Sequence, residues 1–171
     1  MMDRMRHRAG AMLGALAIAL LASGCTPEPT PTPSPTGFAS EEEAFAAAEA
    51  TYRAYVDAVS ALQTGMQAID PSKLLVGQAL DDDLASAREL EATGKRLEGP
   101  VGIARINPLD ATTSAATIHA CLDLSRSRVI ESSGEDVTPS DRPSSFSVEI
   151  VAIWTPDGAR ISSSQPSEHS C

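Results

Sequence analysis

Apolar residues recur at steps of three and four along residues 40–65, which is the spacing of one face of an α-helix. Ser40 is a candidate N-cap, and Glu43 three residues further on has the position of the second residue of a capping box. The pattern predicts a long amphipathic helix that ends near Gly65. Its apolar stripe comprises Phe45, Ala48, Tyr52, Tyr55, Val56, Val59 and Leu62.

Two further helices are expected before the chain reaches Gly99. Asp70 followed by Pro71 is typical of an N-cap and a first helical position, and it predicts a short helix through Val76. A third helix is expected from about residue 80 to residue 97. Its inward-facing residues should be Leu80, Leu84, Ala87 and Leu90.

The pattern changes to strict alternation after residue 100. Four segments, 101–106, 112–124, 144–154 and 158–164, carry β-branched residues at alternate positions and are separated by turn signals. The strongest turn signal is Pro156-Asp157-Gly158, which predicts a hairpin. Three N-terminal helices followed by about four strands predict an α+β fold, with a curved antiparallel sheet packed on the helices.

Residues 1–25 have the layout of an export signal that ends in a cysteine. Arg4, Arg6 and Arg8 precede an apolar run over residues 9–23, which is shorter than the about 20 residues that a transmembrane helix needs. The sequence "LLASGC" then places small residues directly before Cys25.

This segment resembles the lipobox of bacterial lipoproteins, in which the cysteine thiol is diacylglycerylated and the signal is cut just before it. One departure is Ala22, which stands where the family prefers Leu. The resemblance implies a signal peptide over 1–24, a lipid on Cys25 and a domain held at the extracytoplasmic face of the cell membrane. The alternative is an ordinary signal peptide that leaves Cys25 free or disulfide-bonded.

Residues 25–37 form a stalk rich in Pro and Thr. Proline occupies every second position from 27 to 35, which predicts an extended polyproline II segment of roughly 35 Å. A ligand for an SH3-type partner is the alternative interpretation. The remaining residues, 38–171, are enough for one domain with its own core.

Charge narrows the possible partners. The whole chain has a net charge of −10, and without residues 1–24 it keeps 10 basic and 22 acidic side chains, a net charge of −12. Such a surface is repelled by nucleic acid and by anionic headgroups. We therefore expect no nucleic-acid partner, and membrane attachment only through the lipid on Cys25.

Cys121 and Cys171 are the two cysteines of the expected domain. In an exported protein disulfides form and persist, so we expect this pair to be bonded and structural. A buried thiol at 121 and a free one at 171 are the alternative.

His119 and Asp123 are the only candidates for acid–base chemistry. Alternation places both on one face of their strand together with Cys121, but about 13 Å apart, which is too far for a direct hydrogen bond. A solvated strand face is the favoured interpretation. The sequence contains no G-x-S-x-G, H-E-x-x-H or C-x-x-C motif, and we expect neither a cofactor nor a metal site.

The order of elements resembles the nuclear-transport-factor-two-like cone, a cystatin-like α+β roll, and in particular lipoproteins of Gram-positive, actinobacterial type that carry this domain behind a Pro/Thr stalk. The matching features are the helix with "AAAEATYRAYVDAV", the "GP" before the first strand, "ACLDLS", a late tryptophan and a terminal cysteine. The resemblance covers roughly residues 38–171 and implies a cone-like sheet. The fold by itself does not define a function.

Three functional hypotheses follow. The first is a non-enzymatic cell-envelope lipoprotein that contacts an envelope protein or a small ligand. The second is a carrier or enzyme that uses a cone pocket with His119 or Asp123, which requires a cavity of about 300 Å³ or more. The third is a subunit of an envelope transport or secretion assembly, which requires an exposed apolar patch.

Overall fold

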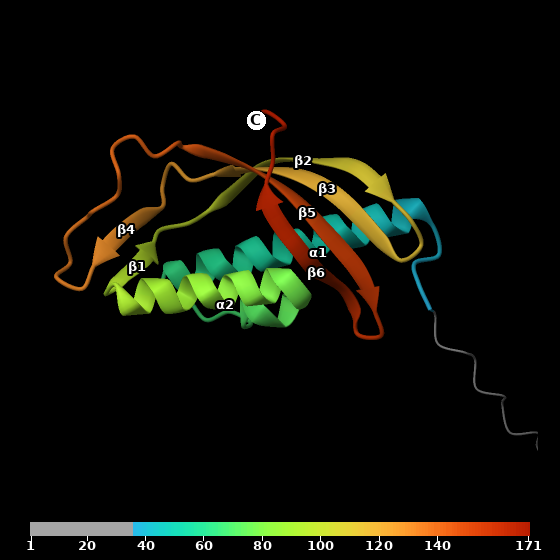
Figure 1. Cartoon of the computed structure of the whole chain (residues 1–171), viewed down its shortest axis with the longest axis horizontal. Coiled ribbons are helices and arrows are strands. Elements are labelled where there is room, and N and C mark those ends of the chain that lie inside the picture. Colours follow the sequence, from blue (N-terminus) through green and yellow to red (C-terminus); the bar gives the residue numbers. More distant parts are fainter. Residues whose placement is uncertain (1–35) are drawn as a thin grey trace, which may run out of the picture. The chain divides into compact units, whose positions relative to one another are not determined.

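A computed structural model gives the structure of the protein over residues 36–171 (Figure 1). The expected signal peptide, Cys25 and the stalk up to residue 35 lie outside the described residues. The elements follow in the order α1 (Glu41–Gln63), the 3-10 helix η1 (Pro71–Leu74), α2 (Gly77–Ala92), β1 (Lys95–Glu98), β2 (Gly102–Ala111), β3 (Ala115–Asp123), β4 (Arg128–Glu131), β5 (Ser145–Thr155) and β6 (Gly158–Pro166).

The main sheet has four antiparallel strands in the order β2-β3-β5-β6, so β3 and β5 are its central strands. It contains the four strands that the alternating pattern predicted. The hairpin between β5 and β6 is confirmed, because Thr155 pairs with Gly158, and Gly158 has a φ of +102°. The α+β class and the antiparallel pairing are therefore correct.

Helix α1 begins and ends close to where the sequence predicts. The Ser40 side chain accepts a hydrogen bond from the Glu43 N–H at 3.1 Å, and the Glu43 carboxylate accepts one from the Ala39 N–H at 2.8 Å. The first contact satisfies a backbone donor that the first helical turn leaves unpaired, and the second fixes the residue just before the N-cap. The three acidic residues of the first turn favour the same helix end through the helix dipole.

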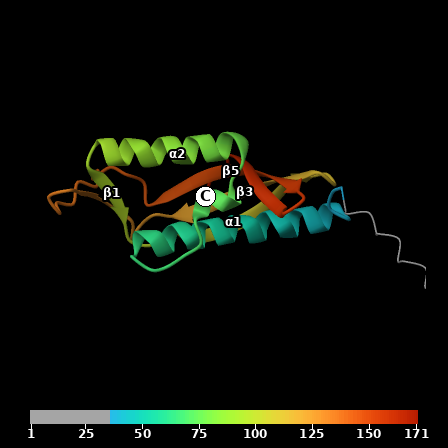
Figure 2. The same ribbon diagram turned by 90° about the horizontal axis from the view of Figure 1, so that it is seen from below.

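The core lies between α1 and the main sheet. Ala44 and Ala48 of α1 are fully buried, and Tyr52 and Val56 continue the same face of the helix. The sheet contributes the alternate residues of β3 and β5, including Ile118 of β3 and the residues Val148, Ile150 and Ala152 of β5. In Figures 1 and 2 both helices lie along one side of the sheet, and the C-terminus lies on the other side in Figure 1.

The prediction of a third helix over residues 80–97 is wrong in its boundaries. Helix α2 begins at Gly77 and ends at Ala92, and Gly94 leaves the helix with a φ of +64°. The short predicted helix at Asp70 is a single 3-10 turn, in which the Asp70 side chain accepts from the Ser72 N–H at 3.0 Å. The described residues thus contain two α-helices and not three.

A second, two-stranded sheet was not predicted. β1 pairs with β4 antiparallel, and Lys95 lies opposite Glu131. Each strand has only four residues, too few to display alternation, and the residues that pair are separated by about thirty positions in the chain. The last three residues of the predicted third helix, 95–97, therefore belong to a strand, which ends one residue later at Glu98.

Gly99 is the tightest point of this second sheet. It has a φ of +87°, and a Cβ atom there would lie 2.2 Å from the Arg126 carbonyl oxygen. Gly134 has nearly the same angle, +90°, but nothing lies within 4 Å of its Cβ position. Adding a Cβ atom at Gly134 therefore costs only the backbone angle, whereas adding one at Gly99 costs the angle and a steric clash.

We expect Gly134→Ala to lower the free energy of unfolding by about 1 kcal/mol, the cost of a left-handed backbone angle. Gly99→Ala should lose a further 1 to 3 kcal/mol, roughly the cost of overpacking, because the Arg126 carbonyl must move. Urea unfolding of both variants measures the difference. Equal losses would show that the approach of Gly99 to Arg126 is not sterically limiting.

Candidate functional site

An apolar groove lies between the C-terminal halves of the two α-helices. It has a volume of about 600 Å³, within the range of small-molecule sites. We call it the helix groove and define it by its apolar lining residues: Tyr55, Val59 and Leu62 of α1, Ala87 and Leu90 of α2, and Leu97 of β1.

The apolar stripe of α1 is divided between the core and the helix groove. Ala48, Tyr52 and Val56 face the sheet and are buried. Tyr55 and Leu62 belong to the same predicted stripe but line the groove, and 54% of the Leu62 surface is exposed. The stripe is therefore wider than the sheet can cover.

Helix α2 shows the same imbalance. Of its residues only Ala79 is buried, and Leu80 packs partly against the core. The predicted inward residues Leu84 and Ala87 are exposed, and Leu90 is half-buried. The prediction that all four face the interior is wrong, because the C-terminal half of α2 faces the groove and not the sheet.

Polar groups stand at defined places in the helix groove. The Tyr55 hydroxyl donates to the Asp83 carboxylate at 2.8 Å and links the two helices. Burial, with a further contribution from the Asp83 charge, raises the pKa of Tyr55 well above its usual value. The side-chain oxygen of Gln63 is buried and accepts no hydrogen bond from any described residue. A buried acceptor of this kind costs free energy until a donor reaches it.

Positive charge at the groove comes from β1. Lys95 is half-buried and forms no ion pair with any residue of the described range 36–171. Its neighbour Arg96 pairs with Glu98 at 2.6 Å and donates to the Glu131 carbonyl. Lys95 is therefore the cation that an anionic group in the groove can pair with.

The space between α1 and the sheet is filled. The largest fully buried side chains are Tyr52, Ile118, Ile150 and Ile161, and all four lie in the core cluster. A smaller hollow of about 260 Å³ lies at the edge between α1 and β2, lined by Arg53, Val56 and Asp57 of α1 and by residues 101–103. Neither His119 nor Asp123 lines the helix groove.

His119 lies on the opposite face of β3, which we call the outer face. Its neighbours Ile118 and Ala120 are in the core, so the predicted division of this strand into two faces is confirmed. The expectation of a solvated face is wrong for His119, which is only 3% exposed. Its Nε2 lies 2.8 Å from the Ser147 hydroxyl, and its Nδ1 lies 3.4 Å from the Asn107 side chain.

Burial lowers the pKa of His119, the neighbouring His169 and Arg105 lower it further, and the charge of Glu149 opposes them. Asp123 lies two positions beyond Cys121 at the end of β3 and is half-buried. Its carboxylate accepts from the Ser125 N–H at 2.9 Å, and this hydrogen bonding lowers the pKa of Asp123. No hydrogen bond joins Asp123 to His119 among the described residues, so the two do not form an acid–base pair.

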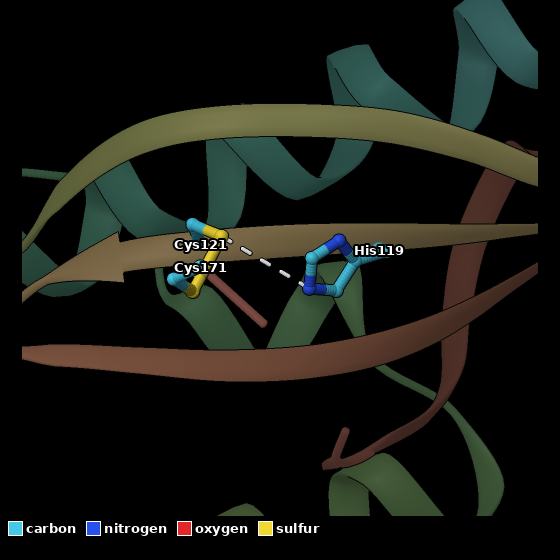
Figure 3. A group of neighbouring side chains, drawn as sticks. All are labelled: His119, Cys121 and Cys171. Atoms are coloured by element: carbon cyan, nitrogen blue, oxygen red, sulfur yellow. Dashed lines mark hydrogen bonds between the residues drawn. A yellow bond between two sulfur atoms is a disulfide. The ribbon is translucent and has the colours of Figure 1, made fainter. Parts of the chain in front are cut away.

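Cys121 and Cys171 form a disulfide beside His119 (Figure 3). Their Cα atoms are 5.5 Å apart, within the usual range for a disulfide. The bond attaches the C-terminal segment, residues 167–171, to the outer face of the sheet. Sequence reasoning predicted the pair but not that this segment would bury the imidazole next to it.

The helix groove was missed at the sequence level. The signal was present in the width of the α1 stripe, because Tyr55, Val59 and Leu62 lie beside the face that Tyr52 and Val56 define. A stripe too wide for one partner indicates a second contact. The path of residues 93–99 decides what covers the face of α1 that carries Tyr55, Val59 and Leu62. The hydrophobic pattern of the sequence did not reveal that path.

Within residues 36–171, no helix combines the length and the apolar character that crossing a membrane requires. No protein-family model and no curated protein matches the chain. Among solved structures, the chain is similar to the intermembrane space region of the chloroplast protein ARC6, with a TM-score of 0.53 and 14% identity over 72% of this chain and 95% of that one.

A second similar structure is the Kfla4162 protein from Kribbella flavida, with a TM-score of 0.46 and 18% identity over 75% of this chain and 92% of that one. At 14% identity, the similarity to the ARC6 region shows a shared fold and gives no information on function.

We expect loss of the disulfide to lower the free energy of unfolding by about 4 kcal/mol, because the bond closes a loop of about 50 residues in the unfolded chain. The double variant Cys121→Ala with Cys171→Ala tests this in guanidinium unfolding. Cys25→Ser is the control and should match the parent protein. A loss below about 1 kcal/mol would show that the bond restricts the unfolded chain much less than the length of its loop implies.

Proposed function

We propose that this protein is a lipid-anchored lipoprotein of the cell envelope whose domain binds a small amphipathic molecule in the helix groove. The role is binding and not catalysis. The single observation that carries the proposal is the groove itself, an apolar depression of about 600 Å³ in which, among residues 36–171, the buried Gln63 oxygen has no hydrogen-bond partner and Lys95 has no ion pair.

The anchoring half of the proposal rests on the sequence. The Arg-rich start, the short apolar run and the small residues before Cys25 support lipidation. A diacylglyceryl group supplies two acyl chains, and two chains give stable anchoring where one is marginal. The stalk to residue 37 then separates the domain from the membrane, and the lipid is the only membrane contact that the acidic chain requires.

The binding half rests on the groove. Val59, Leu62 and Leu90 offer an apolar floor on which a hydrocarbon or ring body loses contact with water. A hydrogen-bond donor on the ligand satisfies the Gln63 oxygen, and an anionic group pairs with Lys95. These groups favour a ligand with an apolar body and a small polar or anionic end.

The cone-like fold remains part of the proposal. Helices that precede an antiparallel sheet, in the order of the nuclear-transport-factor-two-like domains, support it. That fold places ligands and partners at many different sites, so the groove and not the fold defines the function proposed here.

Filling the groove tests the binding proposal. Ala87 and Ala85 are both exposed residues of α2, but only Ala87 lines the groove. The probe is anilinonaphthalene sulfonate, which has an apolar ring body and one anionic group. With the chain from residue 25 onward carrying Cys25→Ser, we expect Ala87→Trp to weaken probe binding at least about tenfold, equivalent to about 1.4 kcal/mol.

Ala85→Trp is the matched control and should bind the probe as the parent protein does. Fluorescence titration measures both variants, and urea unfolding checks that each remains folded. If Ala87→Trp binds the probe as tightly as Ala85→Trp, the groove is not the binding site and the proposal fails.

Lipidation is tested separately at Cys25. We expect Cys25→Ser, expressed in a bacterial host, to lose acylation, because serine has no thiol to carry the diacylglyceryl group. Thr26→Ser, one residue further on, should be acylated as the parent protein is. Mass spectrometry of the N-terminus is the measurement, and an acylated Cys25→Ser protein or an unacylated parent would contradict the expectation.

A further inference from the structure

We propose that reduction of the Cys121–Cys171 disulfide creates a Zn²⁺ site in which Cys121, Cys171 and the Nε2 atom of His119 are the three protein ligands. We call these residues the outer-face cluster. The cluster lies on the face of the sheet opposite the core, and none of its residues lines the helix groove. The inference is therefore independent of the proposed binding function.

One distance within the outer-face cluster is already close to that of a tetrahedral ion, and the two sulfur atoms reach the required separation of about 3.8 Å only after their bond is broken. One ligand atom from each of the three residues lies within 4.8 Å of the others, and Cys121 Sγ is 4.0 Å from His119 Nε2 (Figure 3). Zinc binds sulfur at about 2.3 Å and imidazole at about 2.0 Å, so tetrahedral geometry separates the two ligand atoms by about 3.6 Å. The sulfur and nitrogen atoms of Cys121 and His119 are thus within half an ångström of the required separation.

The neighbours of His119 orient it for this role. Its Nδ1 lies 3.4 Å from the Asn107 side-chain amide. Because the nitrogen and oxygen of such an amide are interchangeable by a half-turn, Asn107 can accept from an Nδ1–H. Nε2 then binds metal once it gives up its 2.8 Å contact with the Ser147 hydroxyl. Ligating histidines are commonly held through their second ring nitrogen in this way. His119 is also only 3% exposed, so its ring position is fixed by packing.

The C-terminal segment stays close to the sheet without the disulfide. Arg105 donates to the carbonyl oxygens of Ser170 and Cys171 at 3.2 and 3.3 Å. The Ser167 N–H donates to the Ser147 carbonyl at 3.0 Å, and the Ser147 hydroxyl donates to the His169 carbonyl. These contacts keep the Cys171 sulfur near the other two ligands after the bond is broken, which reduces the entropy lost on metal binding.

Reduction requires a dithiol reductant. One thiolate of the reductant attacks the sulfur of Cys171, the exposed partner, and displaces Cys121 as a thiolate. The Arg105 guanidinium, 3.8 Å from the Cys121 sulfur, stabilises that thiolate. The second thiol of the reductant then displaces Cys171 and closes the reductant's own disulfide. In total two electrons and two protons pass to the protein, and Zn²⁺ binding releases the two thiol protons.

The ligand set selects the metal class. Two thiolates and one imidazole suit Zn²⁺, whereas Mg²⁺ and Ca²⁺ prefer oxygen ligands. Three protein ligands leave one tetrahedral position for water. Sequence reasoning did not predict this site, because His119 and Cys121 are only two residues apart on one strand and the third ligand comes from the C-terminus.

The test uses Co²⁺ as a spectroscopic probe and Zn²⁺ in competition with a chromophoric chelator. The protein is the full chain in a non-ionic detergent. It carries Cys25→Ser, and this substitution removes the third thiol. After reduction and anaerobic removal of the reductant, we expect one equivalent of Co²⁺ to give a sulfur-to-cobalt charge-transfer band and tetrahedral d–d bands. The oxidised protein should give neither.

His119→Gln should keep both thiols but weaken Zn²⁺ binding at least about tenfold. His169→Gln is the matched control, because His169 lies beside His119, with ring centroids 5.3 Å apart, but outside the ligand set, and it should bind Zn²⁺ as the parent does. Circular dichroism of each reduced variant checks that it is folded. The proposal is overturned if the folded, reduced parent gives no cobalt spectrum, or if His119→Gln binds Zn²⁺ as tightly as the parent.

Discussion

The close packing of α1 on the central strands of the sheet is the contact on which the rest of the domain depends. It is possible because small side chains meet on both sides: Ala44 and Ala48 on the helix, and Ala120 and Ala152 on the strands, are all completely buried. With no bulky groups at these points the helix backbone comes near the sheet, and Tyr52 fills the remaining space beside them. This packing fixes which residues of α1, β3 and β5 face inward. It thereby also fixes which residues face away.

Each candidate site lies on a face of α1 or β3 that points away from the contact between α1 and the sheet. On α1, the face next to the core presents Tyr55 and Leu62 to α2, whose groove residues include the small side chains of Ser86 and Ala87. On β3, alternation turns His119 and Cys121 outward once Ile118 is in the core, and the C-terminal segment covers them. The helix groove on α1 is apolar and open. The second site is polar, covered and closed by a disulfide. Their chemistry differs, but the same packing positions both.

Local signals in the sequence were sufficient wherever the structure is determined locally. Ser40 and Glu43 form the expected cap, Gly158 forms the expected hairpin, and the two faces of β3 follow from simple alternation. The failures have a common cause in contacts between distant residues. The segment from Lys95 becomes a strand only because β4 is available to pair with it, and a helical pattern carries no information about that partner. His119 is buried by residues about fifty positions away, so its own surroundings in the sequence predicted a solvated side chain.

The length of α1 has a consequence for how the groove meets its surroundings. The helix has 23 residues and so extends roughly 34 Å, with the chain from the stalk joining it at Glu41 and the groove beginning only at Tyr55. The described residues that precede the helix, 36–40, therefore join α1 at the end away from the groove. A protein fused ahead of residue 36 would enter the domain at the capped end of the helix, roughly four helical turns before the first groove residue, Tyr55.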